Sequence, residues 1–160
     1  MSFADLSRVQ LGPVAWDDPD LQRLAVAQQA ELRARYGGAS EPGVPPSAAD
    51  LGLILLARDD AGAVLGCGAL RQLGPGTAEL KRMYVVPAAR GRGVSKVVLA
   101  ALEDAARERG WTTLRLETGP RQPEAIALYS GAGYRPTGAF GAYDGDPDAT
   151  GSLYFERVLS

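Results

Sequence analysis

The sequence predicts a mixed α/β fold, and three observations lead to this prediction. Residues 78–86 end in a β-branched and aromatic run typical of a strand, and Pro87 marks its exit because proline cannot donate to a central ladder. After a glycine-rich turn, one apolar stripe recurs at helical spacing: Val94, Val97, Val98, Ala101, Leu102 and Ala105. Residues 112–118 then alternate between leucines and charged residues, as a half-buried strand does.

The elements before this unit are less regular. We expect a first strand within residues 3–11 and a helix from Pro19 to about Tyr36, with Asp17 or Asp18 as its cap and two glycines after it. Residues 39–50 contain three prolines and are predicted to form a loop. A strand pair should follow, at residues 51–58 and 63–73 around a turn at 59–62.

The elements after the long helix complete the prediction. The strand at 112–118 should be followed by a short helix over about 122–129. Two last strands are expected at residues 139–143 and 152–159, joined by a loop at 144–151.

Composition indicates one soluble globular domain, residues 1–160, which would bury roughly 70% of its unfolded surface. The net charge of −2 provides no basic field for nucleic acid or an anionic membrane. No apolar run approaches the ~18 residues of a membrane span, and the N-terminus lacks a charged-then-apolar signal. The single cysteine excludes an internal disulfide and favours a cytoplasmic setting.

Histidine is absent from the chain. This excludes Ser-His-Asp and Cys-His catalysis and most zinc chemistry, so no metal is expected. General acid–base catalysis must then use Glu, Asp, Tyr, Lys, a chain terminus or water. Cys67 is expected to be a small buried hydrophobic residue, because a histidine-free chain supplies poor activation for an acyl-cysteine route.

The turn at residues 90–95 is a candidate anion site. A helix N-terminus presents unpaired N–H groups and favours negative charge, and glycines let the backbone approach closely. The dinucleotide fingerprint does not fit, because Lys96 stands where its third glycine should be, and the chain contains no P-loop string. The pattern that fits is R-x-x-G-x-(small), formed by Arg90, Gly93 and Ser95.

This pattern resembles the pyrophosphate-binding loop of the GNAT acyltransferase superfamily, whose cosubstrate is acetyl-CoA. A second resemblance is the run Gln122 to Tyr129 followed by Gly133 and Tyr134, which is similar to the superfamily's short helix ending in Leu-Tyr-x-x-x-Gly-aromatic. Ser95 replaces the usual Gly or Ala, and Gln122 replaces the usual Asn. The resemblance runs from about Ile54 to the end of the chain.

The resemblance implies a GNAT-like fold, a central mixed, mostly antiparallel twisted sheet flanked by helices. It implies that acetyl-CoA binds in a splay between two central parallel strands. A backbone N–H near residues 83–85 would donate to the oxyanion. The implied cosubstrate contacts are Met83, Tyr84, Val85, Arg90, Gly91, Arg92, Gly93, Val94, Ser95, Lys96, Gln122 and Tyr129.

The resemblance also implies that Tyr129 is the general acid that protonates the leaving thiolate. A thiol pKa of about 8.5 and a tyrosine pKa of about 10 make this transfer feasible. The alternative is a core or CoA-contacting tyrosine.

The expected base is Glu79, at the strand start where the resemblance implies one, or Glu117 at the end of the next strand, and either could act through water. An alkyl amine of pKa about 10.4 is neutral in only ~1 of 2,500 molecules at pH 7, so an ordinary carboxylate is a poor direct base. Burial would bring the two pKa values closer together. The alternative is a cross-strand ion pair of either glutamate with Lys81 or Arg115.

The acceptor pocket is implied at two places. One is the end of the first helix and the loop after it, with Arg33, Arg35, Tyr36 and Glu41; the alternative is a solvated helix end. The other is the segment 140–147, where Phe140 and Tyr143 would close over the acceptor; the alternative is a turn rich in Asp, Gly and Pro.

The sequence therefore predicts an acetyl-CoA-dependent N-acetyltransferase that acts by direct transfer in a ternary complex. We expect a small-molecule amine as acceptor, no nucleic-acid or membrane partner, and a possible homodimer. A protein N-terminus or lysine, an O-linked acceptor and a longer acyl donor stay open as alternatives. A non-catalytic acyl-CoA sensor is also open, whereas RNA binding by the Arg-Gly turn is disfavoured by the net charge.

Overall fold

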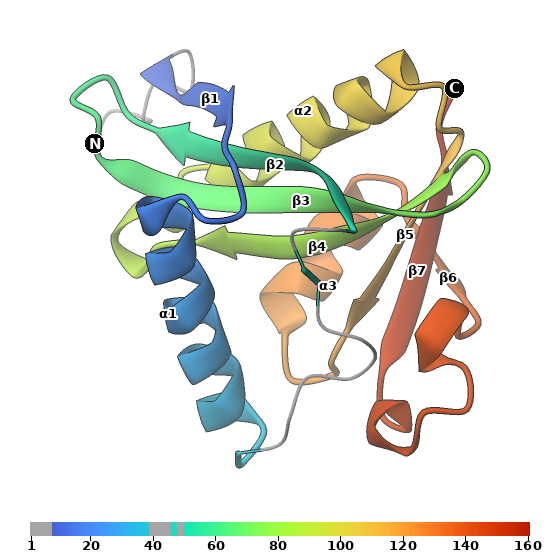
Figure 1. Cartoon of the computed structure of the whole chain (residues 1–160). Helices are drawn as coiled ribbons and strands as arrows, with labels where there is room; N and C mark the ends of the chain where they lie inside the picture. The colour runs from blue at the N-terminus through green and yellow to red at the C-terminus, as the bar shows by residue number, and fades with distance from the viewer. Residues whose placement is uncertain (1–7, 39–45, 48–49) are drawn as a thin grey trace.

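The computed structural model describes residues 8–38, 46–47 and 50–160, and its centre is a seven-stranded sheet. The strands are β1 (Gln10–Pro13), β2 (Leu51–Arg58), β3 (Val64–Gly74), β4 (Thr77–Val85), β5 (Thr113–Thr118), β6 (Arg135–Thr137) and β7 (Leu153–Val158), in the order β1-β2-β3-β4-β5-β7-β6 (Figure 1). The helices are α1 (Pro19–Arg35), α2 (Val94–Glu108) and α3 (Pro123–Gly131). The sheet is mostly antiparallel and carries helices on both faces, which confirms the predicted mixed α/β fold.

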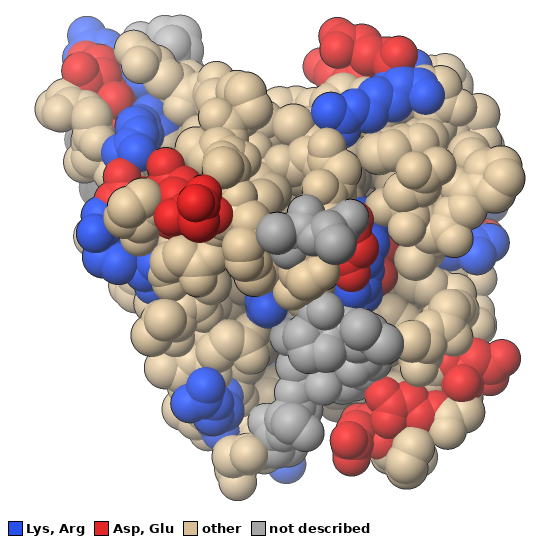
Figure 2. Space-filling view, in the orientation of Figure 1, with Lys and Arg blue, Asp and Glu red and all other residues tan. Residues whose placement is uncertain are grey.

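The two faces of the sheet have separate cores. One cluster packs α2 and α3 against the sheet through buried residues such as Leu80, Leu102 and Leu114. The other packs Leu21 and Leu24 of α1 against β2 and β3. Most of the face drawn in Figure 2 is uncharged, and acidic and basic side chains lie beside one another at its upper left and upper right. None of the helices in the described part of the chain is both long and apolar enough to cross a membrane.

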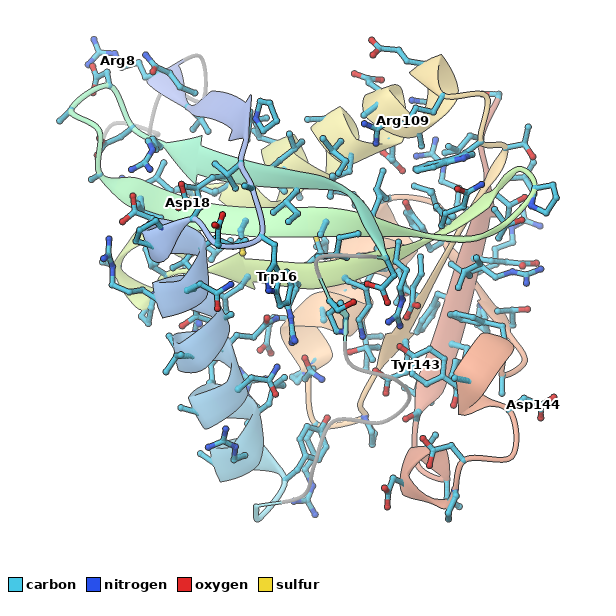
Figure 3. The ribbon with its side chains drawn as sticks, in the orientation of Figure 1. Arg8, Trp16, Asp18, Arg109, Tyr143 and Asp144 are labelled. Atoms are coloured by element: carbon cyan, nitrogen blue, oxygen red, sulfur yellow. The ribbon has the colours of Figure 1, made fainter. Side chains whose placement is uncertain are left out.

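Helix α1 begins where the sequence indicates. The Asp18 carboxylate accepts from the N–H groups of Asp20 at 2.9 Å and Leu21 at 3.1 Å, and Pro19 takes the first helical position. Figure 3 shows Asp18 at the upper end of this helix. Of the two cap candidates, Asp18 is therefore confirmed.

The central feature of the sheet is its one parallel pair. β4 and β5 pair only from Thr77–Glu79 to Thr113–Arg115, and the strands separate beyond Glu79 and Arg115. β4 also carries a bulge, because Cys67 pairs with Tyr84 whereas Ala69 pairs with Lys81. Arg82, at this bulge, has φ +57°.

Three local predictions need correction. Residues 139–143 are not a strand, because Gly141–Tyr143 form a 3₁₀ turn, η3, whose Gly141 has φ +53°. A second 3₁₀ turn, η4, spans Pro147–Ala149, and the short edge strand β6, which contains Pro136, was not expected. The first strand starts at Gln10, later than the window 3–11 indicates, and residues 1–7 lie outside the described residues.

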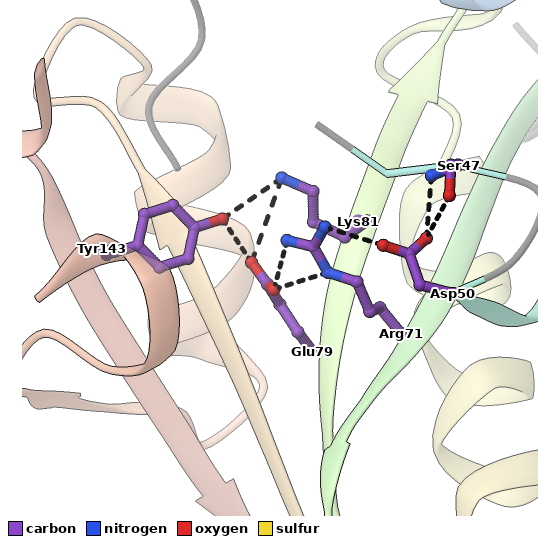
Figure 4. A network of polar contacts seen from close by, with 6 residues as sticks. All are labelled: Ser47, Asp50, Arg71, Glu79, Lys81 and Tyr143. Carbon is purple, nitrogen blue, oxygen red and sulfur yellow. Dashed lines mark hydrogen bonds and ion pairs between the residues drawn. The ribbon is translucent and has the colours of Figure 1, made fainter. Parts of the chain in front are cut away.

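A buried polar network joins η3 to the sheet at the point where β4 and β5 separate (Figure 4). Glu79 has an exposed fraction of 0%, and its Oε1 accepts from Arg71 Nε at 3.2 Å and Nη2 at 2.9 Å. Its Oε2 accepts from the Tyr143 hydroxyl, and Lys81 Nζ lies 3.2 Å from that hydroxyl and 3.9 Å from Oε2. Asp50 lies 3.4 Å from Arg71.

The protonation of Tyr143 follows from its surroundings. Burial, together with the neighbouring Glu79 carboxylate, raises the pKa of the Tyr143 hydroxyl. The hydroxyl therefore keeps its proton and donates a hydrogen bond to the Glu79 carboxylate. The centroid of the Tyr143 ring lies 5.2 Å from that of Phe140, in an edge contact, and 5.6 Å from that of Tyr154. Aromatic packing and a charge-assisted hydrogen bond therefore hold η3 in place.

Gly66 of β3 provides a test of how closely β3 and β4 approach each other. A Cβ added there would lie 2.5 Å from the Tyr84 carbonyl oxygen, so Gly66→Ala should lower the free energy of unfolding by roughly 1–3 kcal/mol. Gly74→Ala in the same strand meets nothing within 4 Å and should change it by less than about 1 kcal/mol. Urea unfolding of both variants measures the difference, and equal midpoints would contradict the close strand approach.

Tyr143→Phe tests the network. The substitution leaves a buried oxygen of Glu79 without its hydroxyl donor, so the free energy of unfolding should fall by roughly 1–3 kcal/mol. The matched control is Tyr154→Phe, whose hydroxyl lies 3.5 Å from the Ala149 carbonyl on a less buried ring. In thermal or urea unfolding, Tyr143→Phe should be less stable than this control. If the control were the less stable variant, the network would not have the stabilising role described.

Candidate active site

Two cavities meet where β4 and β5 separate. The larger cavity has a volume of about 420 Å³ and lies between the C-terminal half of α1, β4, the end of β5 and the segment around η4. The smaller cavity has a volume of about 220 Å³ and lies between α1, the end of β4, the turn 90–95 and α3. The residues that line both cavities are Gln28, Leu32, Met83, Gln122, Ala125 and Tyr129.

The smaller cavity ends at the glycine-rich turn. Gly93 is the N-cap of α2 with φ +82°, a left-handed conformation that suits glycine, and no side chain caps the helix. The first-turn N–H groups of α2 are therefore available to an anion. The residues of this turn and of the first turn of α2 that line the cavity are Arg90, Gly91, Gly93, Val94 and Ser95, whereas Arg92 and Lys96 line neither cavity.

Arg90 connects this turn to α1. Its Nη1 and Nη2 lie 2.8 Å and 3.1 Å from the two carboxylate oxygens of Glu31, and its Nε donates to the Val85 carbonyl at 2.9 Å. The hydrogen bond to Glu31 contributes most to the raised pKa of the Arg90 guanidinium. Arg90 thus braces the turn, and an anion that bound its guanidinium would compete with Glu31.

Tyr129 lies at the junction of the cavities. It belongs to α3, is 5% exposed, and its ring makes an edge contact with Tyr134 at 5.6 Å. Burial raises the pKa of its hydroxyl, so the hydroxyl keeps its proton at neutral pH. The site therefore holds a protonated phenol between the two cavities.

The two glutamates that the sequence offers as bases lie in different surroundings. Glu117 lines the larger cavity, and its Oε2 accepts from Ser152 Oγ at 2.6 Å. Glu79 lines neither cavity, and its contacts with Arg71 and Lys81 form the kind of ion pair that was the alternative to a catalytic role. Arg115, another expected partner, contacts Glu156 at 3.1 Å.

The other expected site residues divide between the two cavities and the core. Met83, Tyr84 and Val85 line the smaller cavity, as does Arg35, which forms an ion pair with Glu124. Arg33 and Tyr36 line the larger cavity. Phe140 and Tyr143 are buried and line neither, and Glu41 lies outside the described residues.

Sequence reasoning assigned the end of α1 to the site but missed the residues before it, Gln28 and Glu31. Gln28 donates from Nε2 to the Met83 carbonyl at 3.0 Å, and Glu31 holds Arg90. Only Leu21 and Leu24 of this helix are buried, both in its N-terminal half. The absence of an apolar stripe after Leu24 was the available signal, because a helix that faces a cavity has no apolar core to contact.

Comparison with known proteins identifies the family. Residues 17–134 match the family model of the acetyltransferase (GNAT) family. The chain is 39% identical over 143 residues to the IAA acetyltransferase of Azospirillum brasilense, covering 84% of this chain and 91% of that protein. It is 33% identical over 87 residues to an uncharacterized N-acetyltransferase of Schizosaccharomyces pombe, covering 54% of this chain and 53% of that protein.

Solved structures share the fold. One is the crystal structure of a Klebsiella pneumoniae protein that is named as an acyl-CoA N-acyltransferase. It superposes with a TM-score of 0.80 at 35% identity, covering 95% of this chain and 98% of the other. A GNAT family acetyltransferase from Elizabethkingia anophelis, solved with acetyl-CoA bound, has a TM-score of 0.71 at 17% identity, covering 96% and 99%. The chain therefore belongs to the acetyltransferase (GNAT) family and is an acyltransferase of the N-acetyltransferase type.

Proposed function

We propose that this enzyme transfers an acetyl group from acetyl-CoA to the amine of a small molecule, by direct attack in a ternary complex. The observation that carries the proposal is the junction of two cavities at Met83 and Tyr129. The smaller cavity ends at an anion-binding turn and suits the cosubstrate. The larger cavity suits the acceptor, and the two substrates would meet at the junction.

Acetyl-CoA supplies an activated thioester, and the chain supplies the groups that orient and stabilise it. Because β4 pairs with β5 only as far as Glu79, the later N–H groups on that edge of β4 face the opening. In this proposal one of them, between Met83 and Val85, donates to the oxygen on which negative charge develops. Gln28 holds the Met83 carbonyl and so fixes the orientation of this stretch.

Two side chains account for the protons. The amine nitrogen forms a bond to the acetyl carbon as the carbon–sulfur bond breaks. Tyr129 gives its proton to the leaving sulfur. Glu117 accepts the amine proton through water, because it lines the larger cavity whereas Glu79 is held in the buried network.

A small-molecule acceptor is favoured over a protein. The larger cavity is walled by α1 on one side and by the segment around η4 on another, and a volume of about 420 Å³ matches a small ligand. The similarity to an IAA acetyltransferase across most of both chains also supports a small acceptor. Release of CoA on addition of amine separates this enzyme from a sensor that binds acetyl-CoA without turnover.

Gly93→Asp tests the cosubstrate site. A carboxylate at the N-cap of α2 would repel a phosphate, so acetyl-CoA affinity should fall at least about tenfold. Gly110→Asp is the matched control, because Gly110 also has a positive φ, +75°, and lies outside both cavities. Isothermal titration with acetyl-CoA compares them, and equal affinities would remove the turn from the proposed site.

Tyr129→Phe tests the chemical step. Loss of the proton donor should lower kcat by roughly 10²–10⁴-fold and leave acetyl-CoA affinity nearly unchanged. Tyr154→Phe, outside both cavities, is the control. Steady-state CoA release with a panel of amines provides the measurement, and a kcat close to the wild-type value would show that another group protonates the thiolate.

Three further expectations stay predictions. We infer a single catalytic domain over residues 1–160 and a cytoplasmic setting, the latter from the single, buried Cys67. Burial raises the pKa of the Cys67 thiol to about 12, which agrees with a packing role. The possible homodimer can be examined by light scattering.

A further inference from the structure

The larger cavity carries two cationic side chains that no described carboxylate neutralises. Arg33 and Arg121 both line it, and neither forms an ion pair with any residue in the described ranges. Arg121 instead donates to the Arg35 carbonyl at 2.9 Å and stacks 5.8 Å over the Tyr36 ring. Its guanidinium is thereby held at the cavity with donors left over, because a guanidinium has five.

The same cavity has buried donors without acceptors. Gln29 Nε2 and Thr118 Oγ1 are buried atoms that lack a hydrogen-bond partner, and Thr118 is 4% exposed. Buried polar atoms in folded proteins are nearly always paired, so donors left unpaired in a cavity wall mark places where a water molecule or a ligand atom accepts a hydrogen bond. Gln29 and Arg33 are four residues apart on α1 and therefore share one face of the helix.

The acidic groups of this cavity come from other elements. Glu117 is on β5 and Asp148 is on η4, and both line the cavity. Figure 2 shows basic side chains over the lower end of α1 and acidic ones over the segment of η3 and η4, at the lower right. The carboxylates of this cavity therefore come from β5 and η4. Its cations come from α1 (Arg33), from β4 (Lys81 and Arg82) and from the segment between β5 and α3 (Arg121).

We propose that the acceptor is an amine that also carries a carboxylate, an amino acid or a close analogue. Its carboxylate would contact Arg33 and Arg121 and accept from Gln29, and its amine would lie toward Glu117. This inference rests on the proposed acetyl transfer and specifies its substrate class. It also gives the two arginines a role in specificity that is separate from the chemical step.

The test compares amino acids with their own carboxamides as acceptors, by CoA release at saturating acetyl-CoA. Each pair has the same side chain and nearly the same shape, and only the carboxylate charge is removed. In the absence of any contact with the enzyme, the amide would be the more reactive acceptor, because loss of the neighbouring carboxylate lowers the pKa of its ammonium group. We expect kcat/KM to be at least about tenfold higher for the acid of the preferred pair.

Variants connect this preference to the two arginines. In the double variant Arg33→Gln/Arg121→Gln, the acid-to-amide ratio of kcat/KM should fall about tenfold, through a higher KM for the acid. Both side chains are exposed, so the fold should persist, and the single variant Arg33→Gln should show part of the loss. Arg135→Gln is the control, because Arg135 is exposed and lines neither cavity; its ratio should match the wild type.

The outcomes separate the two proposals. Turnover that favours the amides, or a ratio that the double variant leaves unchanged, would overturn the carboxylate inference while acetyl transfer stands. Acetyl-CoA binding without CoA release for any amine would overturn acetyl transfer to small amines, and the inference would fail with it. A preference for acids that the double variant abolishes would support both.

Discussion

The site depends on one constraint, which is that β4 and β5 stop pairing soon after they meet. Parallel neighbours normally share a ladder along their length, but here the pairing ends at Glu79 and Arg115. Backbone groups beyond that point need partners from elsewhere, and one β4 carbonyl, that of Met83, accepts from a glutamine on α1. A substrate is the other kind of partner that an opened sheet can accept.

The buried network lies at the point where the opening begins. Glu79 is fully buried at the last pair of the ladder, and Arg71, Lys81 and Tyr143 surround its carboxylate. A buried carboxylate is tolerated only when it is paired and hydrogen-bonded, so these groups must stay together. They join β3, β4 and η3 where the sheet divides, and so they hold η3 against β4, which is one wall of the opening.

Local signals in the sequence located part of this site. The glycine turn and Tyr129 could be found because their motifs lie within short stretches, and Gly93 does cap α2. Lys81 was offered as a partner of Glu79, but Tyr143 could not be found, since it is far away in sequence and sits in a turn that was expected to be a strand. Gln28 was missed because a polar helix residue usually faces solvent, and only the tertiary arrangement turns it toward the opening.

Residues on different sides of helix α1 border different cavities. Gln28 and Leu32 border both cavities, Glu31 and Arg35 border only the smaller, and Gln29 and Arg33 border only the larger. Substitutions at 29 and 33 can therefore redesign one cavity without touching the residues that border only the other. Under the proposed division of the two cavities between donor and acceptor, substitutions on one side of this helix would change the acceptor while the residues proposed to bind the donor stay constant.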